Sequence, residues 1–208
     1  MSSNKQWVLE GVPRGAGTAL DLGGGVGELG PPLRERGYSY VNVDFDDRGG
    51  DLDVRGDAMR LPIRSGAVEL VVSSDTLEHF RHPERALAEV ERVLTTGGHL
   101  VVWVPFLHPF HGTDLFRYTP LGLEVMIADA GLELQRIESP LWAVSVVAQG
   151  VLTLAQRLRL GRLERPLEQG AAWVDARLGA RRRQAAAFAA AYLVVATKPV
   201  PDRDGVDR

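Results

Sequence analysis

A group of glycines that could bind a ligand through its backbone follows the first apolar segment of the sequence. Asp21, Gly23, Gly25 and Gly27 form the pattern D-x-G-x-G-x-G at the end of the segment TALDL. Gly25, Gly27 and Gly30 also fit G-x-G-x-x-G, the fingerprint of dinucleotide-binding loops. In both interpretations the glycines let the main chain turn tightly and approach a ligand at the carboxyl edge of a parallel sheet.

Two features favour the pattern D-x-G-x-G-x-G. The dinucleotide fingerprint would place Asp21 inside a buried strand, where an unpaired carboxylate is costly. It would also place Pro31 and Pro32 inside the next helix, where proline removes a hydrogen bond. In the favoured pattern Asp21 ends the strand, and there it can order the loop or accept a hydrogen bond from a ligand ammonium group. The alternative is a glycine-rich turn without a ligand.

Further carboxylates end the next two predicted strands, YVNVD at 40–44 and LDVRGD at 52–57. Asp44 could accept two hydrogen bonds from a ribose diol, which is the role of an acidic residue about 20 positions beyond a nucleotide-binding loop. Asp57 could accept a hydrogen bond from an adenine amino group. Each aspartate alone could be a solvated turn residue, but carboxylates at successive strand ends favour one shared ligand.

Candidates for acid–base chemistry follow the predicted strand 99–104, in the segment PFLHPFHGTDLFRYT. Histidine has an ordinary pKa near 6.5, so it suits a general base at neutral pH. His111 and His108 are the candidates for the base, unless they belong to a plain surface loop, and Asp114 is the acidic candidate beside them. His79, in the segment LEHF, is a further candidate or else a packing residue.

Three larger side chains are predicted to contact a substrate: Arg117, Tyr118 and Trp142. Arg117 could bind an anionic group, although Arg117 and Tyr118 could instead brace the loop, because they directly precede a predicted helix. The histidines and Asp114 have no convincing third partner in the sequence, so no metal site is predicted.

Apolar strands alternate with helical segments, which predicts a parallel sheet covered on both faces. The segment HPERALAEVERVLTTGG carries apolar residues at helical spacing, a proline suited to the first turn, and glycines at 97 and 98 that suit its end. A second helix is predicted at about 120–130. The predicted strands cover 18–22, 40–44, 52–57, 68–73, 99–104, 132–139 and 190–198.

Residues 141–189 interrupt this alternation and predict a helical insertion before the last strand. The segment LWAVSVVAQGVLTLAQRLRL is apolar almost all round and then becomes basic, with eight arginines against three acidic residues over 141–190. The insertion could cover a substrate or form a dimer face. Residues 141–162 could lie on an anionic membrane surface, or they could form a buried helix with a solvated basic face. Its apolar part is too short to span a bilayer. Residues 199–208 are predicted to form a disordered tail.

Size and composition fit one globular domain, predicted to cover residues 1–198. The chain has 208 residues, 45% of them hydrophobic, and a net charge of −3. The absence of cysteine rules out disulfides and suits a cytoplasmic protein, and the N-terminal residues lack the apolar core of a signal peptide. Negative charge, with no aromatic residues between the arginines, argues against a nucleic-acid partner.

Five segments in order, over residues 17–133, resemble class I S-adenosylmethionine-dependent methyltransferases: LDLGGGVG, VNVDFD, GDAMRLPIRSGAVELVVSSDTLEHF, HPERALAEVERVLTTGGHLVVWVP and DLFRYTPLGLEVMIADAGLE. The resemblance implies a Rossmann-like, doubly wound α/β fold, with seven mostly parallel strands and the last antiparallel. It also implies S-adenosyl-L-methionine as the cofactor. The residues implied to bind this cofactor are Asp21, Gly23, Gly25, Gly27, Asp44, Phe45, Asp57, Ala58, Met59, Ser74 and Leu77.

The sequence departs from the family in the loop, where Gly24 and Val26 replace the usual cysteine and threonine. The resemblance implies methyl transfer to a small-molecule acceptor, such as a natural product, a sugar or a lipid-linked molecule, with oxygen preferred over nitrogen. One alternative is a non-catalytic regulatory module of the same fold, and another is a nicotinamide-dependent oxidoreductase. The expected state is a monomer or a homodimer.

Overall fold

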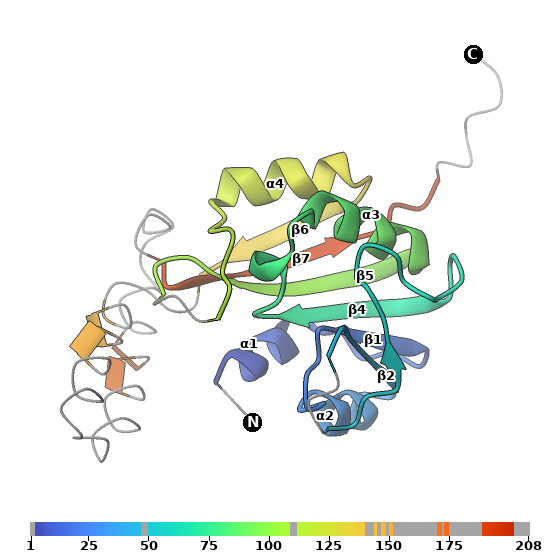
Figure 1. Ribbon diagram of the computed structural model, residues 1–208, viewed down its shortest axis with the longest axis horizontal. Coiled ribbons are helices and arrows are strands. Elements are labelled where there is room, and N and C mark those ends of the chain that lie inside the picture. Colours follow the sequence, from blue (N-terminus) through green and yellow to red (C-terminus); the bar gives the residue numbers. More distant parts are fainter. Residues whose placement is uncertain are drawn as a thin grey trace.

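The computed structural model describes residues 3–46, 50–108, 112–139 and 189–201, and a few single positions between 144 and 174. A seven-stranded sheet forms its centre, in the order β3-β2-β1-β4-β5-β7-β6 (Figure 1). The strands are β1 (Thr18–Leu22), β2 (Ser39–Asp44), β3 (Val54–Arg55), β4 (Val68–Ser74), β5 (Leu94–Pro105), β6 (Glu133–Glu138) and β7 (Ala191–Thr197).

The strands β1 to β5 pair in parallel, and β7 runs antiparallel to both β5 and β6. This confirms the predicted Rossmann-like sheet and its antiparallel last strand. From β1 the chain builds outward through β2 and β3, and then returns to add β4 on the other side of β1. The carboxyl ends of β1 and β4 therefore flank the switch point at which ligands bind in such sheets.

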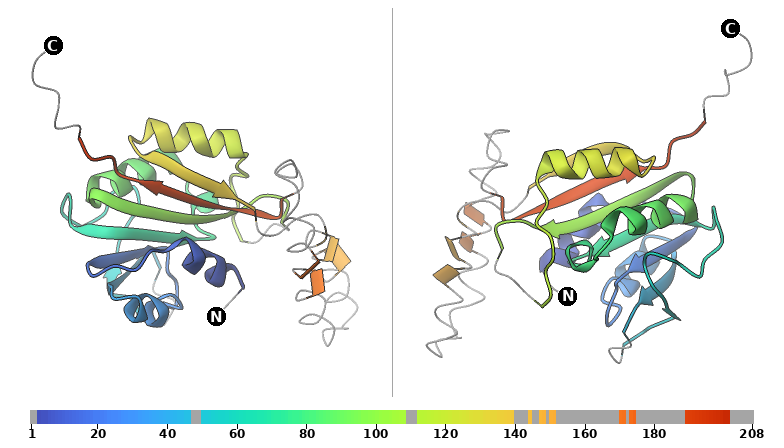
Figure 2. Two further views of the ribbon diagram at one scale, coloured as in Figure 1. Left: turned by 180° about the vertical axis from the view of Figure 1, so that it is seen from behind. Right: turned by 45° about the horizontal axis from the view of Figure 1, so that its top comes forward.

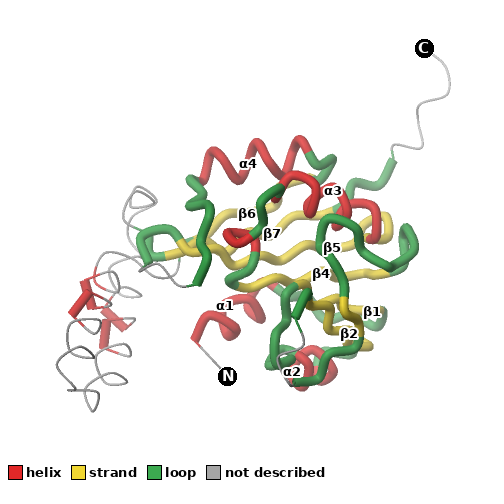
Figure 3. Tube along the Cα trace, viewed as in Figure 1, coloured by secondary structure: helices red, strands yellow, loops and turns green. Residues whose placement is uncertain are grey.

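Helices cover both faces of the sheet, as the strand–helix alternation predicts. One core cluster joins Val8 of α1 and Leu33 of α2 to the sheet, and the other joins Leu87 of α3 and Ile127 of α4 to its opposite face. Figures 2 and 3 show these two groups of helices on opposite sides of the sheet. The helices are α1 (Ser3–Gly11), α2 (Gly30–Glu35), the single 3-10 turn η1 (Leu77–His79), α3 (Pro83–Val93) and α4 (Pro120–Asp129).

The boundary between α3 and β5 differs from the prediction. The helix ends at Val93 rather than at the glycines, and β5 already begins at Leu94. Leu94 pairs with Val68 of β4. Gly97 and Gly98 exchange backbone hydrogen bonds of 2.9 Å with Lys198, which follows β7. Pairing with both neighbouring strands thus draws residues 94–98 into the sheet.

Two further elements differ from the sequence expectation. β3 is reduced to Val54–Arg55, and the helix α1 was not expected. None of the helices in the part of the chain that the structure describes has the length and the apolar composition needed to cross a membrane.

Candidate functional site

The glycine loop joins the end of β1 to α2 and lies at the switch point of the sheet. Gly23, Gly25 and Gly27 all have left-handed backbones, with φ of 73°, 56° and 77°. Side chains other than glycine rarely adopt this conformation. Gly30 lacks a positive φ and begins α2. These φ values fit the pattern D-x-G-x-G-x-G.

Asp21, however, lies inside the buried strand β1 and does not end it, and Pro31 and Pro32 lie in the first turn of α2. The two features that were expected to disfavour the dinucleotide fingerprint are therefore both present, because Tyr40 binds the buried carboxylate and the first helical turn tolerates proline.

Asp21 lies beneath this loop rather than in front of it. Its side chain is fully buried, and its Oδ2 accepts a hydrogen bond of 2.8 Å from the hydroxyl of Tyr40. Burial raises the pKa of Asp21 to about 6, although the Lys5 ammonium and the Tyr40 hydroxyl both act to lower it. Of the two roles predicted for Asp21, this position supports ordering of the loop.

Asn42, which the sequence did not single out, completes the support of the loop. Its amide donates to the carbonyl oxygens of Gly25, at 3.0 Å, and Asp51, at 2.8 Å. A Cβ atom at Gly24 would lie 2.4 Å from Asn42 Oδ1 and 2.6 Å from Asp21 Oδ2. Asn42 and Asp21 thus fill the space that a side chain at position 24 would need.

Asp44 ends β2 and is tied directly to the glycine loop. The Gly25 N–H donates to Asp44 Oδ2 at 2.9 Å, and the Asp46 N–H donates to Asp44 Oδ1 at 3.0 Å. A carboxylate offers about four acceptor positions, so Asp44 retains capacity for a ligand diol. Phe45 follows with 67% of its side chain exposed, and Val26 of the loop is 55% exposed. These apolar side chains are accessible beside the Asp44 carboxylate.

The predicted adenine-binding residues form a tight turn after β3. The Met59 N–H donates to Asp57 Oδ1 at 2.9 Å, and the Arg60 N–H donates to the Asp57 carbonyl at 2.9 Å. Asp57 is exposed, Met59 is half-buried and Ala58 is buried. The turn therefore offers the carboxylate of Asp57 to solvent at the same edge of the sheet.

The end of β4 lies against the glycine loop. The hydroxyl of Thr76 lies 3.4 Å from the Gly23 carbonyl, to which it donates, and a Cβ at Gly23 would touch the Thr76 side chain. Ser74 and Leu77 are nearly fully buried. Leu77 packs into the core beneath η1, so its side chain contributes to packing, whereas Asp75 between these two residues is half-buried and has a φ of 53°.

An acid–base cluster that joins two distant segments lies beside η1. His79 Nδ1 lies 3.3 Å from Asp114 Oδ1, and Arg117 Nη2 donates to Asp114 Oδ2 at 2.5 Å. Glu78 is fully buried, and His79 Nε2 lies 3.9 Å from its Oε1. The backbone N–H groups of Leu115 and Phe116 both donate to the Glu78 carbonyl, which holds the segment 112–118 against η1.

Burial is the main cause that raises the pKa of Glu78 to about 8, and the neighbouring carboxylates of Asp75 and Asp114 raise it further. Glu78 is therefore mostly protonated at neutral pH. Ligand atoms of Glu78, His79 and Asp114 lie within 4.8 Å of one another, a spacing that could hold a metal ion. Because the Arg117 guanidinium already pairs with Asp114, it would repel a metal cation at this position.

The other predicted catalytic and substrate residues have different positions. Tyr118 is buried and its hydroxyl donates to the Leu77 carbonyl at 2.9 Å, while Arg117 also lies 3.4 Å from the His108 carbonyl. These contacts fit the bracing role. His111 and Trp142 lie outside the described residues, as does most of the predicted insertion.

The residues missed by sequence reasoning are Glu78, Asn42 and Asn4. Glu78 and His79 adjoin in the sequence, but their proximity to Asp114 arises only when segment 112–118 folds onto η1. Asn4 belongs to the unexpected helix α1 and donates to Asp75, with Nδ2–O distances of 3.1 and 3.3 Å. No spacing rule in the sequence connects these partners.

Comparisons with known proteins agree with this fold and with a methyltransferase. The family model described as a methyltransferase domain matches residues 20–102. Demethylmenaquinone methyltransferase of Renibacterium salmoninarum is 33% identical over 143 residues, which cover 62% of this chain and 60% of that protein. The chain spans about half the length of the curated mycobacterial methyltransferases that it matches at 34% and 35% identity.

Solved structures share the fold at lower identity. The cyclase SpnF is 22% identical with a TM-score of 0.65, over 94% of this chain and 80% of that one. Phosphoethanolamine N-methyltransferase 2 of Haemonchus contortus, solved with S-adenosyl-L-methionine, is 14% identical with a TM-score of 0.60, over 95% of this chain and 52% of that one. The fold is that of Rossmann-like methyltransferases. The comparisons support a class I S-adenosylmethionine-dependent methyltransferase.

Proposed function

We propose that this protein transfers a methyl group from S-adenosyl-L-methionine to a hydroxyl of a small-molecule acceptor. The observation that carries the proposal is the hydrogen bond between Gly25 of the left-handed glycine loop and Asp44, which joins two ligand-binding elements at the switch point of the sheet. The acid–base cluster of Glu78, His79 and Asp114 lies at the same edge, where an acceptor would meet the cofactor.

The residues at this edge fit the chemistry of the cofactor. A Cβ built on Gly25 would meet no atom of the described residues within 4 Å, which leaves room for a ligand at the loop. Asp44 would accept hydrogen bonds from the ribose, Asp57 from the adenine amino group, and the exposed Phe45 would cover an apolar ring face. When bound, the cofactor supplies a methyl group on a sulfonium, which is already an excellent leaving group.

His79 is our proposed general base. Asp114 faces its Nδ1 at 3.3 Å and is itself held by Arg117. The Asp114 carboxylate would stabilise the positive charge that His79 gains when it takes the proton of the acceptor hydroxyl. His111 and His108 stay alternative bases. General-base assistance is typically about 10²–10⁴-fold in rate.

The acceptor we favour has an apolar body. Leu115 and Phe116, held by the Glu78 carbonyl, are 53% and 40% exposed beside the acid–base cluster. Apolar side chains next to a hydroxyl-activating group support a natural product or lipid-linked acceptor over a bare sugar. The name of the Renibacterium relative, a demethylmenaquinone methyltransferase, points to the same class.

Calorimetry with S-adenosylhomocysteine tests the cofactor assignment. Asp44→Ala should weaken binding by about 1–3 kcal/mol, because hydrogen bonds to a charged acceptor are lost. No binding to the unaltered protein at millimolar concentration would refute the proposal.

Release of S-adenosylhomocysteine with a panel of hydroxylated aromatic and lipid-linked acceptors tests catalysis. With the first acceptor found, His79→Asn should slow turnover more than it changes cofactor affinity. Full cofactor binding without turnover of any acceptor would instead favour the non-catalytic module.

A further inference from the structure

A groove lies at the amino edge of the sheet, opposite the edge that carries the glycine loop. Its volume is about 260 Å³. It is lined by segment 13–16 before β1, by Tyr38 before β2, by Glu69 of β4 and by residues 95–99 of β5. The proposed function uses none of these residues, because they lie where the parallel strands begin, whereas the cofactor edge lies where these strands end.

Glycines before β1 make room for the polar side chains of this groove. A Cβ at Gly15 would overlap with the hydroxyl end of Tyr38, and a Cβ at Gly17 would overlap with the carboxyl group of Glu69. The N–H of Thr18 donates to Glu69 Oε2. The Tyr38 and Glu69 side chains are therefore held against the main chain that forms one wall of the groove.

Both side chains keep hydrogen-bonding capacity that the protein does not use. Among the described residues, neither Glu69 Oε1 nor the Tyr38 hydroxyl has a hydrogen-bond partner, and both atoms are accessible to solvent. Burial and the charge of Glu69 both raise the pKa of Tyr38, so its hydroxyl stays protonated at neutral pH. The groove thus offers a free carboxylate oxygen beside a free hydroxyl.

Arg14 and Glu69 place opposite charges on this groove without pairing. Arg14 is exposed and Glu69 is half-buried, and neither forms an ion pair with any residue that the structure describes. A free anion would be repelled by Glu69, and a simple amine would leave Arg14 unpaired. A ligand that carries both an ammonium and a carboxylate can pair with each of them.

We propose that this groove binds a free amino acid or another small zwitterion, with the ligand ammonium on Glu69 and the ligand carboxylate on Arg14. The volume lies just below the roughly 300–1,000 Å³ of common small-molecule pockets, which limits the ligand to about the size of an amino acid. The site is separate from the cofactor edge and does not depend on the proposed function.

Titration with the twenty common amino acids, followed through the amide signals of the protein in NMR spectra, tests the site. At least one amino acid should bind and shift the signals of Gly15, Gly97 and Gly98 in a saturable way. Two analogues of the tightest binder then test the charges. The amine that lacks its carboxylate and the acid that lacks its ammonium should each bind at least about 10-fold more weakly, because one charge-assisted contact is lost.

Substitutions assign the two contacts. Glu69→Gln keeps an acceptor for the Thr18 N–H but removes the charge, so it should weaken amino-acid binding about 10-fold or more and leave binding of the acid analogue unreduced. Arg14→Gln should weaken binding of the amino acid and of the acid analogue, without affecting the amine. Arg85→Gln, at an exposed arginine of α3 outside the groove, is the matched control and should change no affinity.

S-adenosylhomocysteine at saturation should leave amino-acid affinity unchanged, because the two sites lie at opposite edges of the sheet. Displacement of the amino acid would place it at the cofactor edge and overturn the proposal. Failure of all twenty amino acids to bind at millimolar concentration would also overturn it, as would equal effects of Arg14→Gln and Arg85→Gln, or undiminished binding in Glu69→Gln. If S-adenosylhomocysteine itself does not bind, the proposed function fails while this proposal stands.

Discussion

Single residues beneath the glycine loop determine which side chains the loop can carry. Gly24 stands where the family usually has a cysteine, and the buried side chains of Asn42 and Asp21 occupy the space of its missing Cβ. Asn42 in turn holds the loop through the Gly25 carbonyl. The glycine at position 24 is therefore coupled to Asn42 of β2, whose side chain supports the loop.

Gly24→Ala should destabilise the protein by roughly 1–3 kcal/mol, because the added methyl group overlaps with buried polar atoms. Chemical denaturation measures this, with Gly170→Ala as the control, since a Cβ there would meet no atom of the described part of the chain within 4 Å. In the double variant with Asn42→Ala the loss should be smaller than the sum of the two single losses. Additive losses would contradict the coupling.

Glu78 predicts a pH dependence of stability. Its pKa of about 8 in the folded protein lies above the ordinary value of 4.5, so the folded state holds this proton more tightly than the unfolded chain does. Its contribution to stability is present in full below pH 4.5 and is lost as the pH rises towards 8. Glu78→Gln removes this titration, and should raise stability at pH 8 by roughly 2–4 kcal/mol relative to the unaltered protein.

Denaturation of both proteins between pH 5 and pH 8.5 checks this expectation. The difference in the free energy of unfolding should grow with pH across that interval. A constant difference would mean that Glu78 titrates normally. The same variant should lose turnover, since groups that destabilise a buried site are often those used in function.

At the scale of elements, periodicity predicted the sheet better than it predicted the element boundaries. The valine-rich strands and α3 could be predicted because a buried strand or an amphipathic helix repeats its pattern locally. The start of β5 at Leu94 could not, because it depends on pairing with Val68 and Lys198, which are remote in the sequence. The sequence singled out both His79 and Asp114, but their proximity could not be predicted for the same reason. The position of Asp44 at the end of a strand could be predicted from the local pattern.

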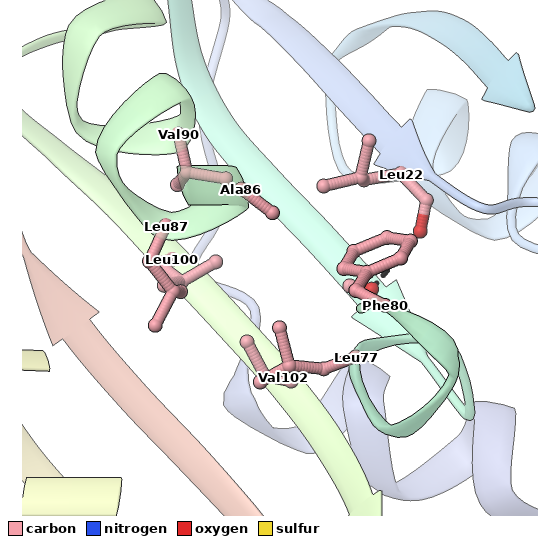
Figure 4. A pocket seen from close by; sticks show the side chains of 9 residues that line it. Leu22, Leu77, Phe80, Ala86, Leu87, Val90, Leu100 and Val102 are labelled. Atoms are coloured by element: carbon pink, nitrogen blue, oxygen red, sulfur yellow. Dashed lines mark hydrogen bonds between the residues drawn. The ribbon is translucent and has the colours of Figure 1, made fainter. Parts of the chain in front are cut away.

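A small cavity lies between α3 and the sheet (Figure 4). Its volume is about 10 Å³, and Leu77, Phe80, Ala86, Val90 and Val102 are among its largely apolar lining residues. It is barely large enough for one water molecule, and its apolar surface offers few hydrogen bonds to one. An added methylene group can therefore enter it at little steric cost.

Val90→Ile should raise the free energy of unfolding by about 0.5–1 kcal/mol, because one more methylene group is buried. Chemical denaturation is the measurement, and cofactor affinity should be unchanged because Val90 lies within α3. A loss of stability would show that the side chains around the cavity already fill it and that the larger residue strains them.

At the scale of the whole molecule, the switch point brings together residues from across the chain. Asn4 of α1, the loop after β1, Asp44 after β2, Asp75 after β4 and Asp114 after β5 lie at one edge of the sheet. Each comes from a separate element, so a ligand at this edge contacts several elements at once. Such a ligand stabilises the folded state as a whole, because the unfolded chain has no such site.

Thermal unfolding should therefore report the cofactor. S-adenosylhomocysteine at a hundredfold excess over its Kd contributes about 2.7 kcal/mol. For a domain of this size that corresponds to a rise in Tm of roughly 5–10 °C. Reduced nicotinamide cofactors should leave the Tm unchanged, because the comparisons support a methyltransferase that uses S-adenosylmethionine. If Asp44→Ala weakens binding by about 1–3 kcal/mol, the variant should lose between about a third and nine-tenths of the rise at the same ligand concentration. An equal rise with a nicotinamide cofactor would instead support the oxidoreductase alternative, since only a ligand with preferential affinity for the folded state can shift the transition.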